Sequence, residues 1–186
     1  MRQLVVNEVI DEKEIRKTLG KDEELTYIFQ MYYKRVYNYI YYRINCDYTA
    51  EDLTSQVFEK IMLKIKTYSK VKAPFEVWVF AIARNVVNDY FRSLKKHKLF
   101  SLDTIKELVS REKTPEGIVV TAETNAKLSR ALDTLDKRER NIIALKFGAN
   151  IKNKDIAQIL DITESNVGVI LYRTMKKLKV EMEREE

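Results

Sequence analysis

The chain has 186 residues, of which 45% are hydrophobic and 33% charged, and its net charge of +6 gives a pI near 9.2. This composition is typical of a soluble globular protein and excludes collagen-like, disordered and membrane-embedded chains. The excess of basic residues favours a polyanionic partner. The longest apolar run, residues 77–83, is too short to span a bilayer. The N-terminus turns acidic too early for a secretory signal. We therefore expect a cytoplasmic protein without membrane insertion.

Apolar residues recur at three- and four-residue steps over most of the chain, which predicts an all-α fold. Three such stripes occupy residues 25–44, 53–65 and 78–90, and the third continues into a basic segment. Pro74 lies between the second and third stripes and predicts a loop there. Strand-like alternation is absent from the sequence.

Two local signals predict where helices begin. Thr49 precedes an Ala-Glu-Asp turn, and Asp136 is followed three residues later by Glu139, which is the spacing of a capping box. Between these points, residues 99–124 are acidic and weakly periodic. We therefore predict two small helical domains, 1–98 and 125–186, joined by an acidic linker at 99–124.

Few residues in this sequence are suited to metal or cofactor chemistry. The single Cys46 excludes an internal disulfide, and with His97 as the only histidine there is no ligand cluster for zinc or haem. The four glycines are scattered, so they form no phosphate-binding loop. We predict no metal, no cofactor and no catalytic residue.

Residues 153–170 predict a helix-turn-helix. The small Ala157 suits a close crossing of two helices, and Asp161 tolerates the left-handed conformation that the turn requires. Asn153 and Thr163 are predicted to cap the two helices. The residues expected to be buried are Ile156, Leu160, Ile162, Val167 and Ile170. A generic helical hairpin is the alternative.

The second helix of this motif would place its exposed face in a DNA major groove. Glu164 or Asn166 would then meet base edges, and Val169 would meet a thymine methyl group. The basic residues further along are better placed for phosphates, or they form a solvated face. The predicted contact set is Glu164, Ser165, Asn166, Gly168, Val169, Tyr172, Arg173, Lys176 and Lys177.

Residues 75–96 interleave aromatic and basic side chains, a pattern suited to single-stranded nucleic acid, whose bases stack on rings while cations follow the backbone. Trp78, Phe80 and Phe91 lie within or beside the apolar stripe and are predicted to belong to the core. The polar face at helical spacing is the candidate for nucleic acid, and it contains Arg84, Asn85, Asn88 and Arg92, with Lys95 and Lys96 in the same basic run.

Three segments carry a family resemblance: "AEDLTSQVFEKI", "FEVWVFAIARNVVNDYFR" and "LDTLDKRERNIIALKF" followed by the helix-turn-helix. In this order, over residues 25–179, they resemble the regions of extracytoplasmic-function sigma factors. The resemblance implies a transcription initiation subunit that is not an enzyme, with the RNA polymerase core and promoter DNA as partners. The first domain would capture the melted downstream element, and the second would read the upstream element as duplex.

The resemblance also implies roles for individual residues. Those on the core-binding helix are Asp52, Leu53, Gln56, Val57 and Phe58; those on the downstream-element helix are Arg84, Asn85, Asn88, Asp89 and Arg92. The loop at 68–74, which includes Lys72, matches the segment that captures a flipped base. An anti-sigma factor is a further implied partner, although no residue of this sequence points to one.

Two departures from the family pattern limit the carry-over. Ser55 and Gln56 stand where a Gln-Glu pair is common, and Gly168 and Ile170 stand where a basic pair is common, so the base preference does not transfer.

Two other functions stay open: a stand-alone helix-turn-helix transcription regulator, and a site-specific recombinase. The acidic linker is either a solvated tether or a segment that enters the polymerase RNA channel.

Overall fold

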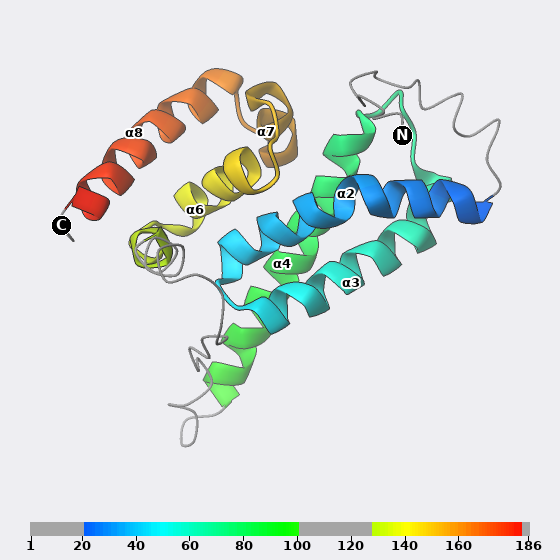
Figure 1. Cartoon of the computed structure of the whole chain (residues 1–186), viewed down its shortest axis with the longest axis horizontal. Coiled ribbons are helices and arrows are strands. Elements are labelled where there is room, and N and C mark those ends of the chain that lie inside the picture. The colour runs from blue at the N-terminus through cyan, green and yellow to red at the C-terminus, as the bar shows by residue number, and fades with distance from the viewer. Residues whose placement is uncertain (1–20, 101–127, 184–186) are drawn as a thin grey trace, which may run out of the picture.

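The computed structural model describes residues 21–100 and 128–183, and the regular structure within these two ranges is entirely helical, as predicted. Residues 21–100, here the N-terminal half, contain α2 (Lys21–Ile44), α3 (Asp47–Lys64), the short 3-10 turn η1 (Ile65–Thr67) and α4 (Phe75–Phe100). Residues 128–183, the C-terminal half, begin with a helical segment at 128–133 and continue with α6 (Lys137–Ile143), η2 (Ala144–Gly148), α7 (Asn153–Leu160) and α8 (Glu164–Glu183) (Figure 1).

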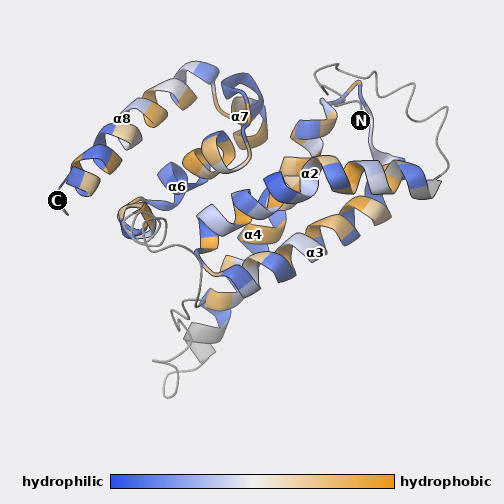
Figure 2. Cartoon of the chain, in the orientation of Figure 1, coloured by the Kyte–Doolittle hydropathy of each residue, from blue (hydrophilic) through white to orange (hydrophobic). Residues whose placement is uncertain are grey.

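The three apolar stripes of the N-terminal half form its interior. Val36 and Ile40 of α2, Val57 of α3, and Phe80 and Val87 of α4 are completely buried. Figure 2 shows the apolar residues of these helices alternating with polar ones along each ribbon, as amphipathic helices require. Each such side chain contributes about 1.5–3 kcal/mol of transfer free energy, so helix packing is the main source of stability here.

The start of α3 differs from the prediction, because Thr49 does not cap it. The helix begins two residues earlier at Asp47, after Cys46, which has an extended backbone and makes no side-chain cap. Asn45 adopts a left-handed conformation with φ of 59°, and this residue already reverses the chain. Thr49 therefore lies inside the first turn, where its hydroxyl lies 3.4 Å from the Cys46 sulfur.

The predicted capping box at the start of α6 is confirmed. The Asp136 carboxylate accepts hydrogen bonds from the backbone N–H groups of Arg138 at 2.7 Å and Glu139 at 2.8 Å. The Glu139 carboxylate accepts in return from the Asp136 N–H at 2.9 Å. These bonds satisfy N–H groups that have no partner within the helix.

The helix-turn-helix is also confirmed. Asp161 has φ of 56° and ψ of 52°, the left-handed conformation expected for the turn between α7 and α8. The N–H groups of Asp161 and Ile162 both donate to the carbonyl of Ala157, whose side chain is buried. Thr163 caps α8 through its hydroxyl, which accepts from the Asn166 N–H at 3.2 Å. The turn is thus closed by local hydrogen bonds.

Asn153 does not act as the predicted cap of α7. It is the first residue of the helix, and Lys152, which makes no side-chain cap, holds the N-cap position. The amide oxygen of Asn153 is buried, and it lacks a hydrogen-bond partner in the part of the chain that the structure describes. The cap prediction was therefore one residue out of register.

The two halves pack directly against each other. One apolar cluster contains buried residues of α2, α3 and α4 together with Ile142, Leu145, Ile156 and Val167 of the C-terminal half. Figure 1 shows α6 lying alongside α2, and α7 contacts α4. A smaller cluster, which includes Leu132 and Leu178, joins the 128–133 segment to α8. Most of the predicted linker lies outside the described residues, so the domain boundaries stay predictions.

Over the residues that the structure describes, no helix has both the length and the apolar character that crossing a membrane requires.

Replacing Ala157 with Leu tests the geometry of the turn. Ala157 is 7% exposed and its carbonyl anchors the turn, so the larger side chain should overpack the site and lower the free energy of unfolding by about 1–3 kcal/mol. Urea unfolding followed by circular dichroism measures this change. The matched control is Gln158→Leu, on the exposed side of α7, which should change stability by less than about 0.5 kcal/mol. Equal stability of both variants would contradict a tight crossing at Ala157.

Candidate nucleic-acid interface

The predicted DNA-facing residues of α8 lie on the open side of the helix. Seven of them are exposed: Glu164, Ser165, Asn166, Val169, Tyr172, Arg173 and Lys176. Gly168 and Lys177 are half-buried. The opposite side of α8 packs inward through Val167, Thr174 and Leu178. The helix therefore presents a largely exposed face, which the start of α6 flanks on one side.

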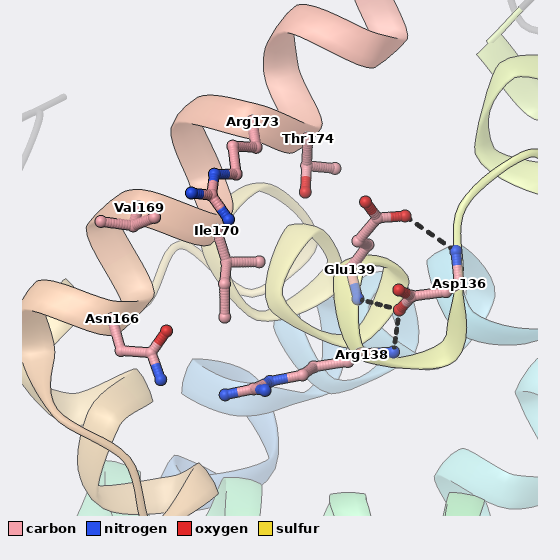
Figure 3. Close-up of a pocket in the computed structure, with 8 residues that line it drawn as sticks. All are labelled: Asp136, Arg138, Glu139, Asn166, Val169, Ile170, Arg173 and Thr174. Atoms are coloured by element: carbon pink, nitrogen blue, oxygen red, sulfur yellow. Dashed lines mark hydrogen bonds between the residues drawn. The ribbon is translucent and has the colours of Figure 1, made fainter.

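A hollow of about 260 Å³ lies between the N-terminal end of α6 and this face of α8. Figure 3 shows the side chains of Arg138, Asn166 and Arg173 around it. The carboxylates of Asp136 and Glu139 also line it, but both already accept the hydrogen bonds of the capping box. The hollow thus offers two guanidinium groups and an amide, opposed by two carboxylates that already occupy the N–H groups at the start of α6.

Arg138 is a candidate that the sequence analysis missed. It precedes Asn166 by 28 positions in the chain, and the periodicity of α8 gives no sign of it. The one available signal was its place at the second position of α6, two residues after the capping residue Asp136, where side chains surround a helix N-terminus.

The two neighbouring lysines of α8 differ in their surroundings. The Lys177 ammonium lies 3.1 Å from the Glu139 carboxylate and its side chain is 41% exposed. Lys176 is exposed. Because an existing ion pair must be given up before Lys177 can neutralise a phosphate, Lys176 is the more available cation.

The candidate face of α4 is mostly open, with one exception. Asn85, Asp89, Arg92, Lys95 and Lys96 are exposed, and Asn88 is half-buried. The Arg92 guanidinium pairs with Asp89 at 2.8 Å, and both side chains are more than half exposed. Arg84 is half-buried because its Nη1 donates to the backbone carbonyl of Ile159, at the C-terminal end of α7. Its Nε is buried and has no hydrogen-bond partner among the described residues.

The loop at 68–74, which is predicted to capture a DNA base, is anchored by aromatic side chains. The Tyr68 ring lies 5.0 Å from that of Phe75 and 5.3 Å from that of Trp78, and its hydroxyl donates to the Ala73 carbonyl at 3.1 Å. Val71 is 98% exposed and Lys72 is exposed. The anchored tyrosine therefore holds the loop while its tip faces solvent.

The five residues assigned to polymerase binding divide into two groups. Leu53, Val57 and Phe58 are buried in the interior of the N-terminal half, so they position α3 from within. Asp52 is exposed and Gln56 is half-buried, and the Gln56 amide donates to the Asp52 carboxylate at 3.0 Å.

Exposed apolar side chains lie on α3 and on the neighbouring α2. Phe29 of α2 is 46% exposed, and Met62 and Leu63 of α3 are 51% and 75% exposed. The Phe29 ring lies 5.0 Å from that of Phe58, so this exposed side chain of α2 packs on α3. Met62 lies within the predicted apolar stripe at 53–65, so its exposure was not expected.

The chain resembles known proteins both in sequence and in fold. Residues 28–97 match the Sigma-70 region 2 family, and residues 125–178 match the Sigma-70 region 4 family. The chain is 28% identical over 163 residues to the extracytoplasmic-function sigma factor BldN of Streptomyces coelicolor, covering 88% of this chain and 62% of that protein. It is 29% identical over 154 residues to SigM of Bacillus subtilis, covering 82% of this chain and 91% of SigM.

Two solved structures share the fold. CnrH in complex with the cytosolic domain of CnrY superposes with a TM-score of 0.66 at 15% identity, over 90% of this chain and 92% of CnrH. The sigma factor RpoE of Bartonella quintana, solved with the anti-sigma factor NepR, gives 0.65 at 14% identity, over 88% and 99%. With both regions matched in order, and relatives of this class covering most of its length, the chain belongs to the extracytoplasmic-function sigma factor family.

Proposed function

We propose that this protein binds the RNA polymerase core in the cytoplasm and directs transcription initiation to specific promoters. In this proposal α8 reads the upstream promoter element as duplex, and α4 with the 68–74 loop captures the melted downstream element. The observation that carries the proposal is the uncovered face of α8, presented by a closed helix-turn-helix and flanked by basic side chains.

Duplex reading is assigned to the first two turns of α8. Glu164 and Asn166 supply hydrogen-bonding groups for base edges, and the 44% exposed Val169 supplies an apolar contact for a thymine methyl group. Arg173 and Lys176 lie further along the helix and are assigned to phosphates. Arg138, across the hollow beside α8, is assigned to the same phosphate backbone.

Capture of the melted strand is assigned to α4 and the loop before it. Arg92, Lys95 and Lys96 supply cations for the sugar-phosphate backbone, and Asn85 and Asn88 supply amide groups for unpaired bases. Lys72, at the exposed tip of the loop, is assigned to the phosphate next to a flipped base.

Binding of the polymerase core is assigned to the surface of α2 and α3, through the Asp52–Gln56 pair and the exposed Phe29 and Met62. A mixed apolar and charged surface of this kind is typical of a protein interface. We also propose an anti-sigma factor as a partner, because the similar sigma factor RpoE was solved with the anti-sigma factor NepR.

Run-off transcription from a fragmented genomic library tests the proposal directly. Purified protein added to active core polymerase should yield a set of transcripts whose start sites share an upstream and a downstream sequence element. If transcription with the protein equals that with core alone, initiation is not its function. A footprint on a palindromic duplex made by the protein without polymerase would instead favour a stand-alone regulator.

Lys176→Ala tests the assignment to phosphate. Removing one phosphate contact should reduce the slope of log affinity against log salt by about one and leave the preferred sequence unchanged. Lys177→Ala is the matched control, and its effect should be smaller because Glu139 already pairs that ammonium. Fluorescence anisotropy with a promoter duplex over a range of salt concentrations measures both slopes. A change in the sequences selected by Lys176→Ala would make this lysine a base-reading residue.

Asp52→Ala tests the polymerase surface. Because Asp52 is exposed, its removal should leave the helical circular dichroism spectrum unchanged and weaken binding to core polymerase roughly fivefold, equivalent to about 1 kcal/mol. The neighbouring exposed Glu51→Ala removes the same charge from a different face of α3 and should have a smaller effect. If wild type and Asp52→Ala bind core polymerase with equal affinity, Asp52 is not part of the polymerase-binding surface.

A further inference from the structure

Glu139 of α6 pairs with a cation on the DNA-facing side of α8. Its Oε2 atom lies 3.1 Å from the Lys177 Nζ and 2.9 Å from the backbone N of Asp136. One carboxylate oxygen therefore serves both the capping box of α6 and an ion pair with a residue 38 positions further along the chain. In the free protein, the charge of Lys177 is already paired.

This ion pair is better held than an ordinary surface pair. A surface pair contributes little to stability, in part because two flexible side chains must be fixed to form it. Here the capping box already fixes the Glu139 carboxylate, and the Glu139 side chain is only 21% exposed. Since only Lys177 is left to be ordered, the pair persists in the free protein.

The charges that line the hollow beside α8 cancel. Arg138 and Arg173 contribute two positive charges, and Asp136 and Glu139 contribute two negative ones. A duplex phosphate that approaches this side of α8 therefore meets carboxylates as well as guanidinium groups (Figure 3). Salt screens partly buried charges less than exposed ones, so the repulsion between Glu139 and a phosphate is not fully screened.

We propose that Glu139 is an internal competitor of DNA phosphate: its carboxylate holds the Lys177 ammonium and keeps the duplex affinity of the free protein low. This inference rests on the proposed reading of duplex DNA by α8. Contacts to phosphate carry no sequence information. Masking one of them therefore weakens binding to every duplex, with or without a promoter, and leaves the choice of sequence to the first two turns of α8.

The size of the effect follows from counterion release. Each phosphate that a lysine neutralises steepens the slope of log affinity against log salt by about 0.9. With this slope, one such contact is worth roughly eightfold in affinity at about 0.1 M salt relative to about 1 M salt. Freeing Lys177 should therefore strengthen duplex binding on the order of fivefold to tenfold at the lower salt concentration.

Glu139→Gln separates the two roles of this side chain. The glutamine amide oxygen still accepts the Asp136 N–H, so the capping box is kept, while the charge that holds Lys177 is lost. The matched control is Asp136→Asn, which removes one negative charge from the same hollow and leaves the ion pair with Lys177 in place. Asparagine is also a good helix cap, so both variants should keep the helical circular dichroism of wild type.

Binding is measured without polymerase, by anisotropy, on fluorescein-labelled mixed-sequence duplex DNA over a range of salt concentrations. At about 0.1 M salt, Glu139→Gln should bind on the order of fivefold to tenfold more tightly than wild type, with a slope steeper by about one. Adding Lys177→Ala to Glu139→Gln should remove both changes, because they act through the Lys177 ammonium. Lys177→Ala in wild type or in Asp136→Asn should change the affinity by less than about twofold.

Three results would overturn the inference. Equal affinity and slope for wild type and Glu139→Gln would show that the ion pair does not keep Lys177 from phosphate. A gain that survives Lys177→Ala, or one that Asp136→Asn matches in full, would be a general effect of charge and not the release of Lys177. If Glu139→Gln loses helical circular dichroism, Glu139→Asp replaces it and is judged by the same comparisons, because its carboxylate is one methylene further from Lys177.

Run-off transcription separates this inference from the proposed function. If wild type directs initiation with core polymerase while Glu139→Gln binds duplex DNA as wild type does, masking by Glu139 fails and the proposed function stands. If neither protein directs initiation, the proposed function fails, while a Lys177-dependent gain on mixed-sequence duplex still supports masking by Glu139.

Discussion

The close approach of η2 to α2 is the contact on which the relation between the two halves depends. Each half alone is small for a stable core, and a small domain buries a lower share of its surface. Ile142, Leu145 and Ile156 of the C-terminal half are completely buried in a cluster that they share with α2, α3 and α4. Without the glycine at 148, η2 would stand further from α2, and this shared interior would be less well packed.

A shared interior also determines how the protein can respond to partners. Separating the halves exposes apolar side chains, at about 25 cal/mol per Å² of apolar surface, and leaves the Tyr39, Arg43 and Asn141 network open to water. The closed arrangement is therefore favoured when the protein is alone. A polymerase core that binds the two halves at a fixed separation would supply the free energy that opening costs, because a ligand shifts an equilibrium only by its difference in affinity for the two states.

Much of the fold follows from local chemistry, and those predictions were correct. The Asp136 capping box and the left-handed Asp161 depend on residues a few positions apart, so sequence spacing was sufficient to find them. Thr49 and Asn153 were wrong as caps because a neighbouring residue already supplies the turn or the cap position. The bond from Arg84 to Ile159 and the fit of Gly148 on α2 join residues 75 or more positions apart, and no periodic pattern reports such contacts. The exposed face of α8 was anticipated, whereas Arg138 across the hollow was not.

Two of the polar contacts that join the halves, one at Asn141 and one at Arg84, differ in how readily a DNA phosphate could replace them. The Tyr39 hydroxyl and Arg43 donate to the Asn141 amide oxygen in a buried site, so these hydrogen bonds would have to break before a phosphate could accept from either donor. Arg84 instead gives one N–H to a neutral carbonyl and leaves Nε without a partner. A phosphate accepts two parallel hydrogen bonds from a guanidinium, and bonds to an ionised acceptor are roughly twice as strong as neutral ones. The Arg84 contact to a neutral carbonyl would therefore be easier to exchange for a phosphate than the buried hydrogen bonds at Asn141.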